Sequence, residues 1–233
     1  EARECGDRGV SRAQAQAGAL MRALRQLLAL STLLGGWIGT GLGAGLGAQS
    51  AEQSAALPLA RPIPPDSTRL VMLGTGTPNA DPERSGPAVA VVRNGKSYLV
   101  DAGVGLVRRA NRMSDAGVSA LNPINLKIVF LTHLHSDHTL GLPDLILTPW
   151  VLEREAPLEV YGPPGTKAMV EHILAAYNAD IRNRIDGLQP ANETGYKVNV
   201  HEITPGEVFS DGNVRVTAIA VPHGEWEVAF GYR

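Results

Sequence analysis

Cysteine is almost absent from this chain. The single cysteine is Cys5, so no internal disulfide bond can form and a zinc site built on cysteine thiolates is excluded. Charged residues make up only 19% of the 233 residues, against 44% hydrophobic ones. This balance is typical of a globular protein rather than a disordered one. The length is sufficient for one large domain or two small ones.

Neither sign of charge dominates the chain. The formal net charge is −2, and residues 51–233 carry 16 Lys and Arg against 20 Asp and Glu, a net of −4. Proteins that bind nucleic acid usually present basic surfaces, because the phosphate backbone is a polyanion. A mildly acidic body therefore gives no electrostatic reason to expect such a partner.

Charge is missing altogether from residues 26–50, which directly follow Arg22 and Arg25. Positive residues, an apolar run and a tail of small residues are the layout of a secretory signal peptide. We therefore predict an upstream extension at 1–20, a cleaved signal peptide at 21–50, and a periplasmic or secreted location. A retained membrane anchor is the alternative, since about 25 uncharged residues could span a bilayer. The many glycines of the segment weaken that alternative.

A proline-rich stretch, residues 51–68, is predicted to be an extended linker before a single domain at 69–233. Periodicity within the domain predicts strands at 69–73, 88–93, 97–101, 126–131 and 158–161, and helices at 104–115, 139–152 and 166–184. Residues 197–203, 207–210 and 214–221 are predicted to form a β-meander, and 228–232 to begin another strand. The fold class is therefore α/β, with a mixed sheet sandwiched by helices.

Three of the six histidines lie within six residues of one another, directly after the apolar strand predicted at 126–131. In an extended segment, residues two apart point to the same side, so His133 and His135 can face one point. A turn then brings Asp137 and His138 to a second point nearby. Imidazole nitrogens and a carboxylate at this density predict metal binding, with two ions rather than one.

The pattern His-x-His-x-Asp-His after a buried strand resembles the signature of the metallo-β-lactamase superfamily. Further segments resemble its ribonuclease Z and arylsulfatase-like branch, namely Leu-Gly-Thr-Gly-Thr-Pro at 73–78, Tyr-Leu-Val-Asp-Ala-Gly at 98–103, Leu-Gly-Leu-Pro at 140–143, and Val-Pro-His-Gly at 221–224 followed by Ala-Phe-Gly-Tyr-Arg at 229–233. The resemblance runs from about residue 69 to residue 233. It implies an αββα four-layer sandwich, which we expect to be incomplete at its C-terminus.

The resemblance also implies a binuclear metal centre. His133, His135 and His223 would hold one ion, and Asp137 and His138 would help to hold the second. Two Zn²⁺ ions are the expected cofactors, with Mn²⁺ or Fe²⁺ as alternatives, because nitrogen and oxygen ligands accept all three. The other histidines, His172 and His201, are expected to be ordinary surface or core residues.

Supporting roles follow from the same resemblance. Asp137 would orient or deprotonate the attacking water, and Asp101 and Thr132 would fix the ligand loop by hydrogen bonds. A buried carboxylate without a metal role is the alternative for Asp101. The bridging aspartate and the last histidine of the family would lie beyond Arg233. We therefore interpret the chain as a C-terminally truncated product with weak or absent catalysis.

The expected function is that of an exported, metal-dependent hydrolase. It would use an activated water on a small-molecule ester such as a sulfate or a phosphodiester. One alternative is a ribonuclease Z-type endonuclease that processes the 3′ ends of transfer RNA, although export disfavours an RNA substrate. The other is a catalytically incomplete binding fragment. No stable membrane span is expected once the signal peptide has been removed.

Overall fold

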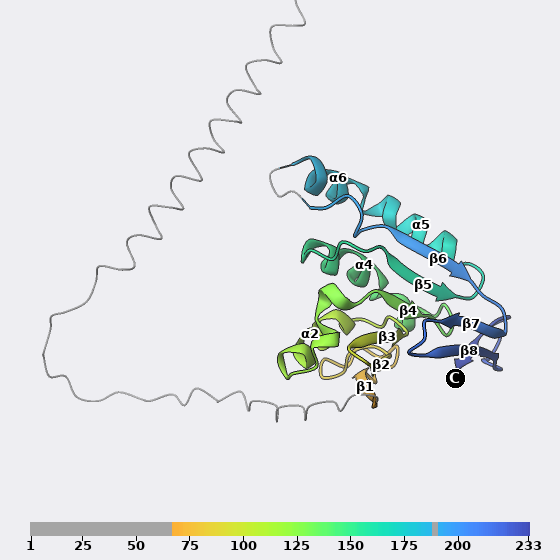
Figure 1. Ribbon diagram of the computed structural model, residues 1–233. Helices are drawn as coiled ribbons and strands as arrows, with labels where there is room; N and C mark the ends of the chain where they lie inside the picture. Colours follow the sequence, from red (N-terminus) through yellow and green to blue (C-terminus); the bar gives the residue numbers. More distant parts are fainter. Residues whose placement is uncertain (1–66, 188–190) are drawn as a thin grey trace, which may run out of the picture. The chain divides into compact units, whose positions relative to one another are not determined.

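The computed structural model describes residues 67–187 and 191–233. The extension and signal peptide expected at 1–20 and 21–50 lie outside these ranges, as does nearly all of the predicted linker. The described part of the chain forms a six-stranded sheet in the order β1-β2-β3-β4-β5-β6 and a three-stranded sheet in the order β7-β8-β9 (Figure 1). Within it, no helix has the length and apolar character needed to cross a membrane.

The strands are β1 (Thr68–Gly74), β2 (Ala88–Arg93), β3 (Lys96–Val100), β4 (Ile128–Phe130), β5 (Leu158–Gly162), β6 (Val198–Glu202), β7 (Gly206–Ser210), β8 (Arg215–Ala220) and β9 (Phe230–Tyr232). The α-helices are α2 (Leu106–Asp115), α3 (Ser136–Thr139), α4 (Leu142–Val151), α5 (Thr166–Ala176) and α6 (Asn178–Asp186). Two short 3₁₀ helices, η2 (Ser119–Leu121) and η3 (Pro123–Asn125), precede β4.

The first sheet is mixed, as the sequence predicts. Strands β1, β2 and β3 are antiparallel, whereas β3, β4, β5 and β6 run parallel. The tight turn between β2 and β3 is formed by Asn94 and Gly95, with φ angles of 48° and 73°. A two-residue hairpin of this kind requires positive φ at two successive residues. Asparagine and glycine adopt this conformation most readily.

The predicted meander at 197–221 is wrong in its first strand. Strand β6 does not pair with β7 but joins the first sheet, parallel to β5, with Leu158 opposite Val198 and Gly162 opposite Glu202. The helices α5 and α6 form the crossover that returns the chain beside β5, which is the usual connection between parallel strands. The actual meander is β7-β8-β9.

Two helices predicted as continuous are each divided. The helix predicted at 139–152 is replaced by α3, which begins at Ser136, and by α4. At Gly141, between them, an added Cβ would lie only 2.3 Å from the carbonyl oxygen of Gly103. The chain therefore bends where only glycine allows this close approach. The helix predicted at 166–184 is divided at Tyr177 into α5 and α6.

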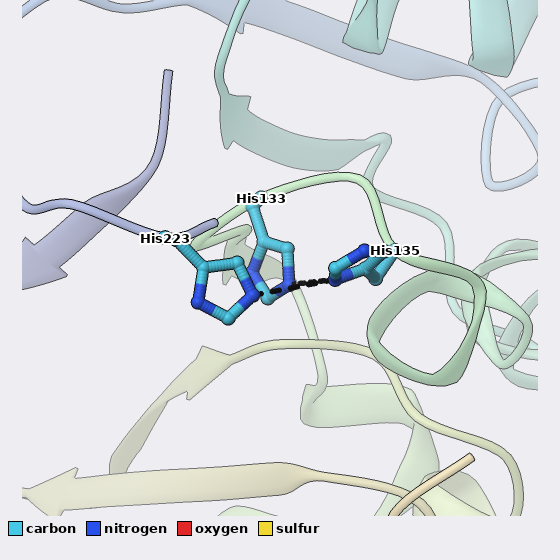
Figure 2. A group of neighbouring side chains, drawn as sticks. All are labelled: His133, His135 and His223. Atoms are coloured by element: carbon cyan, nitrogen blue, oxygen red, sulfur yellow. Dashed lines mark hydrogen bonds between the residues drawn. The ribbon is translucent and has the colours of Figure 1, made fainter. Parts of the chain in front are cut away.

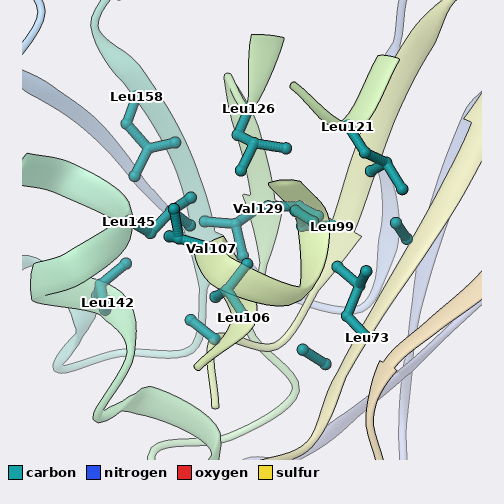
Figure 3. Close-up of a cluster of buried hydrophobic side chains, with 14 of the residues drawn as sticks. Leu73, Leu99, Leu106, Val107, Leu121, Leu126, Val129, Leu142, Leu145 and Leu158 are labelled. Atoms are coloured by element: carbon teal, nitrogen blue, oxygen red, sulfur yellow. The ribbon is translucent and has the colours of Figure 1, made fainter. Parts of the chain in front are cut away.

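The main core lies between the first sheet and the helices packed on one of its faces (Figure 3). It contains Leu99 and Val129 of the central strands, Leu106 of α2 and Leu145 of α4, all fully buried. Alternate residues of a strand point to opposite faces, so Phe130 turns the other way. Its ring stacks on Tyr161 at 5.0 Å and also contacts rings of the second sheet, Phe209 and Tyr232. Side chains thus fill both faces of the first sheet.

A buried arginine ties helix α4 to the sheet. Arg154 is 1% exposed, and its guanidinium donates hydrogen bonds to the backbone carbonyls of Leu126, Leu145, Ile146 and Gly195. Burial lowers the pKa of Arg154 to about 10, so the side chain is still a cation at neutral pH. Its bond to Leu126, just before β4, helps to fix the strand that leads into the histidine segment.

Candidate metal centre

The histidine segment starts at the carboxyl end of β4, in the part of the first sheet that is parallel. Leu131 donates its backbone N–H to the carbonyl of Tyr161 at 2.7 Å, which extends the pairing with β5 by one residue. The chain then passes through His133 and His135 into α3. Strand β3 ends beside it, where Asp101 donates its backbone N–H to Phe130. The carboxyl ends of neighbouring parallel strands are a common place for functional groups.

Three imidazoles converge at this point (Figure 2). One nitrogen from each of His133, His135 and His223 lies within 4.8 Å of the other two. His133 Nε2 is 2.8 Å from His135 Nδ1, and His223 Nε2 is 3.3 Å from the same Nδ1. The sequence predicted that His133 and His135 share one side. His223, which the family resemblance placed with them, follows β8 and is 88 residues from His135.

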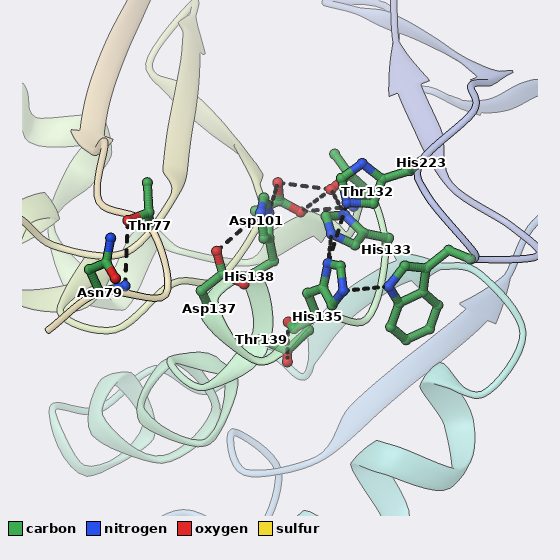
Figure 4. Close-up of polar contacts among 11 residues, drawn as sticks. Thr77, Asn79, Asp101, Thr132, His133, His135, Asp137, His138, Thr139 and His223 are labelled. Carbon is green, nitrogen blue, oxygen red and sulfur yellow. Dashed lines mark hydrogen bonds and ion pairs between the residues drawn. The ribbon is translucent and has the colours of Figure 1, made fainter.

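Asp137 and His138 form a second group of candidate metal-ligating side chains beside the three imidazoles. Both lie in α3, which starts earlier than predicted, and His138 Nε2 is 3.6 Å from Asp137 Oδ2. The ring centroids of His133 and His138 are 4.3 Å apart. The predicted second point is therefore adjacent to the first, as Figure 4 shows.

Asp101 connects the two groups of candidate metal-ligating side chains (Figure 4). It is 6% exposed and has a φ of 63°, which is a strained conformation for a residue other than glycine. Its carboxylate accepts hydrogen bonds from the backbone N–H of Thr132 at 2.8 Å and from Thr132 Oγ1 at 2.9 and 3.0 Å. It also lies 2.8 Å from His138 Nδ1.

These contacts determine which imidazole nitrogens face inward. A carboxylate only accepts, so His138 donates from Nδ1 to Asp101, and its Nε2 faces Asp137. The Thr132 hydroxyl donates to Asp101, so it accepts from His133 Nδ1 at 2.9 Å. His133 Nε2 is left with a lone pair toward the other imidazoles. Such outer contacts typically orient histidine ligands of metals.

The electrostatic environment favours a neutral His133. Burial and, after it, the nearby rings of His138 and His223 together lower the pKa of His133 to about 4. Burial also lowers the pKa of His138, but the hydrogen bond to Asp101 and the charges of Asp101 and Asp137 outweigh it and raise the pKa above its ordinary value. A neutral imidazole is the form that binds a metal ion. The donor set, nitrogen and oxygen only, fits a divalent ion such as zinc.

Trp226 is a contact that the sequence analysis missed. Its indole Nε1 donates a hydrogen bond to His135 Nε2 at 2.7 Å. It lies three residues after His223, but that spacing alone does not show that the loop brings the indole to His135. The two histidines expected to have no metal role lie apart from this cluster: His172 bonds to the carbonyl of Ala168 in its own helix, and His201 pairs with Glu159.

The second sheet contributes to the site through its last strand. Phe230 donates its backbone N–H to the carbonyl of Thr132 at 2.9 Å, and the Tyr232 hydroxyl donates to the carbonyl of Leu131 at 2.7 Å. Burial, and after it the charge of Asp101, raises the pKa of Tyr232, so the phenol keeps its proton. Strand β9 thereby holds the start of the histidine segment. A cavity of about 800 Å³ adjoins His135 and His223.

A family model described as a beta-lactamase superfamily domain matches residues 96–233. The chain belongs to the metallo-β-lactamase superfamily. It is 38% identical over 167 residues to ribonuclease Z of Mycobacterium marinum, a match that covers 70% of this chain and 57% of that protein. The chain thus spans little more than half the length of the curated relatives it matches.

Two solved structures agree with this assignment. The short form of human tRNase Z is similar with a TM-score of 0.54 and 25% identity, over 71% of this chain and 62% of that one. A metallo-β-lactamase fold protein from Bacillus subtilis has a TM-score of 0.53 at 15% identity, over 72% and 58% of the two chains, and shows the fold alone. The expected family, its ribonuclease Z branch and the αββα type of fold are confirmed.

Proposed function

We propose that this chain carries the metal centre of a hydrolase that cleaves phosphodiester bonds in RNA, as a ribonuclease Z-type endonuclease acting on the 3′ ends of transfer RNA precursors. In the sequence analysis, a ribonuclease Z-type endonuclease was only the alternative hypothesis. The names of the relatives support it better than the main hypothesis, a sulfatase-like hydrolase of small-molecule esters. Hydrolysis is common to both alternatives. The exported location is a separate proposal that rests on residues 21–50; it disfavours an RNA substrate and goes with the small-molecule ester alternative.

The observation that carries the proposal is the convergence of the three inward nitrogens of His133, His135 and His223 beside the donor pair Asp137 and His138. Members of the superfamily generally bind divalent metals. We propose two Zn²⁺ ions, one at each group of donors. When bound, such ions lower the pKa of water toward neutrality and stabilise negative charge on the substrate.

The residues of the chain then have separate tasks. Asp101 holds His138 directly and His133 through Thr132, so the inward nitrogens are oriented before a metal ion arrives. Asp137 has a carboxylate oxygen at the edge of the site and is placed to accept a proton from an attacking water. Strand β9 keeps the backbone of the histidine segment in place.

The test is a cleavage assay with the zinc-loaded chain on a precursor transfer RNA with a 3′ trailer, on bis(p-nitrophenyl) phosphate, and on p-nitrophenyl sulfate. We expect weak cleavage of the RNA and the diester and none of the sulfate, and His133→Ala should reduce the rate by about 100-fold or more. His172→Ala is the matched control, because His172 is exposed and its ring bonds to the carbonyl of Ala168 in its own helix. Cleavage of the sulfate alone would contradict the proposal.

A small-molecule ester hydrolase is the second candidate, and one observation favours it. The cavity beside His135 and His223 is lined by Glu225 and Glu227, and no lysine or arginine is among its lining residues. Two carboxylates repel a polyanionic chain at this position. Faster turnover of the neutral ester p-nitrophenyl acetate than of the RNA would favour this candidate.

A further inference from the structure

Three arginines surround a cavity at the carboxyl end of β1. The cavity has a volume of about 360 Å³ and is lined by Arg84, which follows β1, and by Arg109 and Arg112 of α2. Among the described residues that line it, Glu83 is the only acidic one. Residues 51–233 are mildly acidic as a whole, but the charge around this cavity is positive. The cavity therefore attracts anions.

Within the described residues, the arginines of α2 keep their positive charge unpaired. Arg109 is half-buried, and it donates from Nε to Ser85 Oγ at 3.0 Å and from Nη2 to the backbone carbonyl of Glu83 at 3.2 Å. Both acceptors are uncharged. Arg112 is exposed in the last turn of α2 and forms no ion pair in the part of the chain that the structure describes. Guanidinium groups with donors to spare are suited to phosphate oxygens.

Arg84 is paired, but only weakly. Its Nε lies 3.5 Å from Asp81 Oδ2, and the two side chains are 60% and 43% exposed. An ion pair this exposed contributes little to stability, because water screens it. The guanidinium of Arg84 can therefore exchange Asp81 for another anion with little loss.

The loop between β1 and β2 contacts both this cavity and the candidate metal centre. Gly86 donates its backbone N–H to the carbonyl of Val104 at 2.9 Å, and a Cβ added at Gly86 would lie 3.0 Å from the backbone oxygen of Asp137. Ser85, the hydrogen-bond partner of Arg109, directly precedes this glycine. The loop thus joins the arginines to the segment that carries the candidate metal ligands.

The direction of the strands also places the cavity and the metal centre at the same edge of the first sheet (Figure 1). Strands β1 and β3 are both antiparallel to β2, so they run in the same direction, and β4 is parallel to β3. The histidine segment follows β4. Neighbouring strands lie about 4.7–4.9 Å apart, so the ends of β1 and β4 are separated by roughly 14–15 Å. A few nucleotides of an extended RNA strand can span this separation.

We propose that this cavity binds a backbone phosphate of the substrate RNA, an inference that rests on the proposed function. The scissile phosphodiester lies at the histidine segment, and a second phosphate of the same strand lies among the three arginines. Such a contact positions the strand without reading its sequence. The cavity on the side of β5 is lined by Glu225 and Glu227, which repel phosphates. The RNA strand therefore extends from the metal centre toward β1.

The test is the binding of fluorescently labelled precursor transfer RNA, measured by anisotropy at several NaCl concentrations with a chelator present to prevent cleavage. Arg112→Ala should raise the Kd by about 3- to 10-fold and reduce the slope of log Kd against log salt by about 1, because one phosphate contact is lost. Arg84→Ala, at a second exposed position, should act in the same direction. Arg182→Ala is the matched control and should bind as the parent chain does, because it removes the same charge from an exposed position on α6.

Turnover of bis(p-nitrophenyl) phosphate separates the cavity from the metal centre. The zinc-loaded Arg112→Ala variant should hydrolyse this diester at the rate of the parent chain, because a single phosphate cannot occupy both positions. Its kcat/KM for the precursor RNA should fall with the loss of affinity.

Equal affinities of Arg112→Ala, Arg84→Ala and Arg182→Ala for the RNA, or a loss of diester turnover in Arg112→Ala, would overturn the proposal. Displacement of the RNA by inorganic phosphate at an equal concentration of phosphate groups would also overturn it, because the cavity would then be a site for the free ion. The expected differences in binding, without cleavage of the RNA by the zinc-loaded chain, would support the phosphate site and overturn the endonuclease. A parent chain that binds no RNA would overturn both.

Discussion

Asp101 shows how one side chain can organise two groups of metal donors. Its position at the end of β3 was predicted, and its support of Thr132 was expected from family resemblance. The structure adds that the same carboxylate also holds His138. Trp226 was not predictable in this way, because its contact depends on the path of the loop between β8 and β9. The spacing of two residues along a chain does not fix such a path.

Replacing Asp101 with asparagine is expected to weaken metal binding without unfolding the chain. Asparagine has nearly the same shape but offers one acceptor oxygen in place of two, so it cannot hold both Thr132 and His138. We expect the affinity for Zn²⁺ to fall by about 10- to 100-fold in a chelator competition. Asp180→Asn, which removes a surface ion pair with Arg184, is the control. Equal affinities of the two variants would contradict this role.

At the scale of the elements, local signals predicted most strands but not their partners. Asn94 and Gly95 specify their hairpin through backbone preference alone. Strand β6 was placed in the wrong sheet because its pairing with β5 depends on the crossover through α5 and α6, and nothing within β6 itself encodes it. The division of the helix predicted at 139–152 likewise depends on a distant contact, between Gly141 and Gly103.

The contact at Gly141 gives a test at this scale. A methyl group there would overlap the backbone of Gly103, so Gly141→Ala must displace either α3 or the end of β3. We expect the free energy of unfolding in urea to fall by about 1–3 kcal/mol. Gly231→Ala is the control, because its added Cβ would meet only Val221 at 3.5 Å, an ordinary contact. Equal stability of the two variants would argue against the close approach.

At the scale of the whole described fold, polar contacts join the two sheets. They come from β3, near the end of that strand that is remote from the histidine segment. Tyr98 donates its hydroxyl to Asp211 at 2.8 Å, and Lys96 lies 3.1 Å from the same carboxylate. Burial alone raises the pKa of Asp211. Hydrogen bonds from Tyr98, from the backbone of Asn213 and from Lys96 outweigh burial and lower the pKa to about 2.

This junction predicts a dependence of stability on pH. The pKa of Asp211 is lower in the native chain than its ordinary value of 3.8, so its contribution is present above about pH 4 and is lost as pH falls through about 2. Burial, and then the bond to Asp211, raises the pKa of Tyr98 to about 12. Its contribution is therefore present below about pH 10 and is lost as pH rises through about 12.

Urea unfolding between pH 2 and pH 7 measures the acid branch of this dependence. The parent chain should lose more stability on acidification than Asp211→Asn, because asparagine has no proton to gain. Asp180→Asn should follow the parent chain, since Asp180 is exposed on α6. Parallel curves for all three proteins would show that the junction between the sheets contributes no acid sensitivity.

All the roles proposed for the site require that His133, His135 and His223 bind one metal ion. The most direct measurement is an anomalous difference map, recorded at the zinc absorption edge from crystals of the zinc-loaded chain. We predict a peak about 2.0–2.1 Å from His133 Nε2, His135 Nδ1 and His223 Nε2. A map without a peak between these nitrogens, with the three imidazoles turned away from one another, would contradict the account.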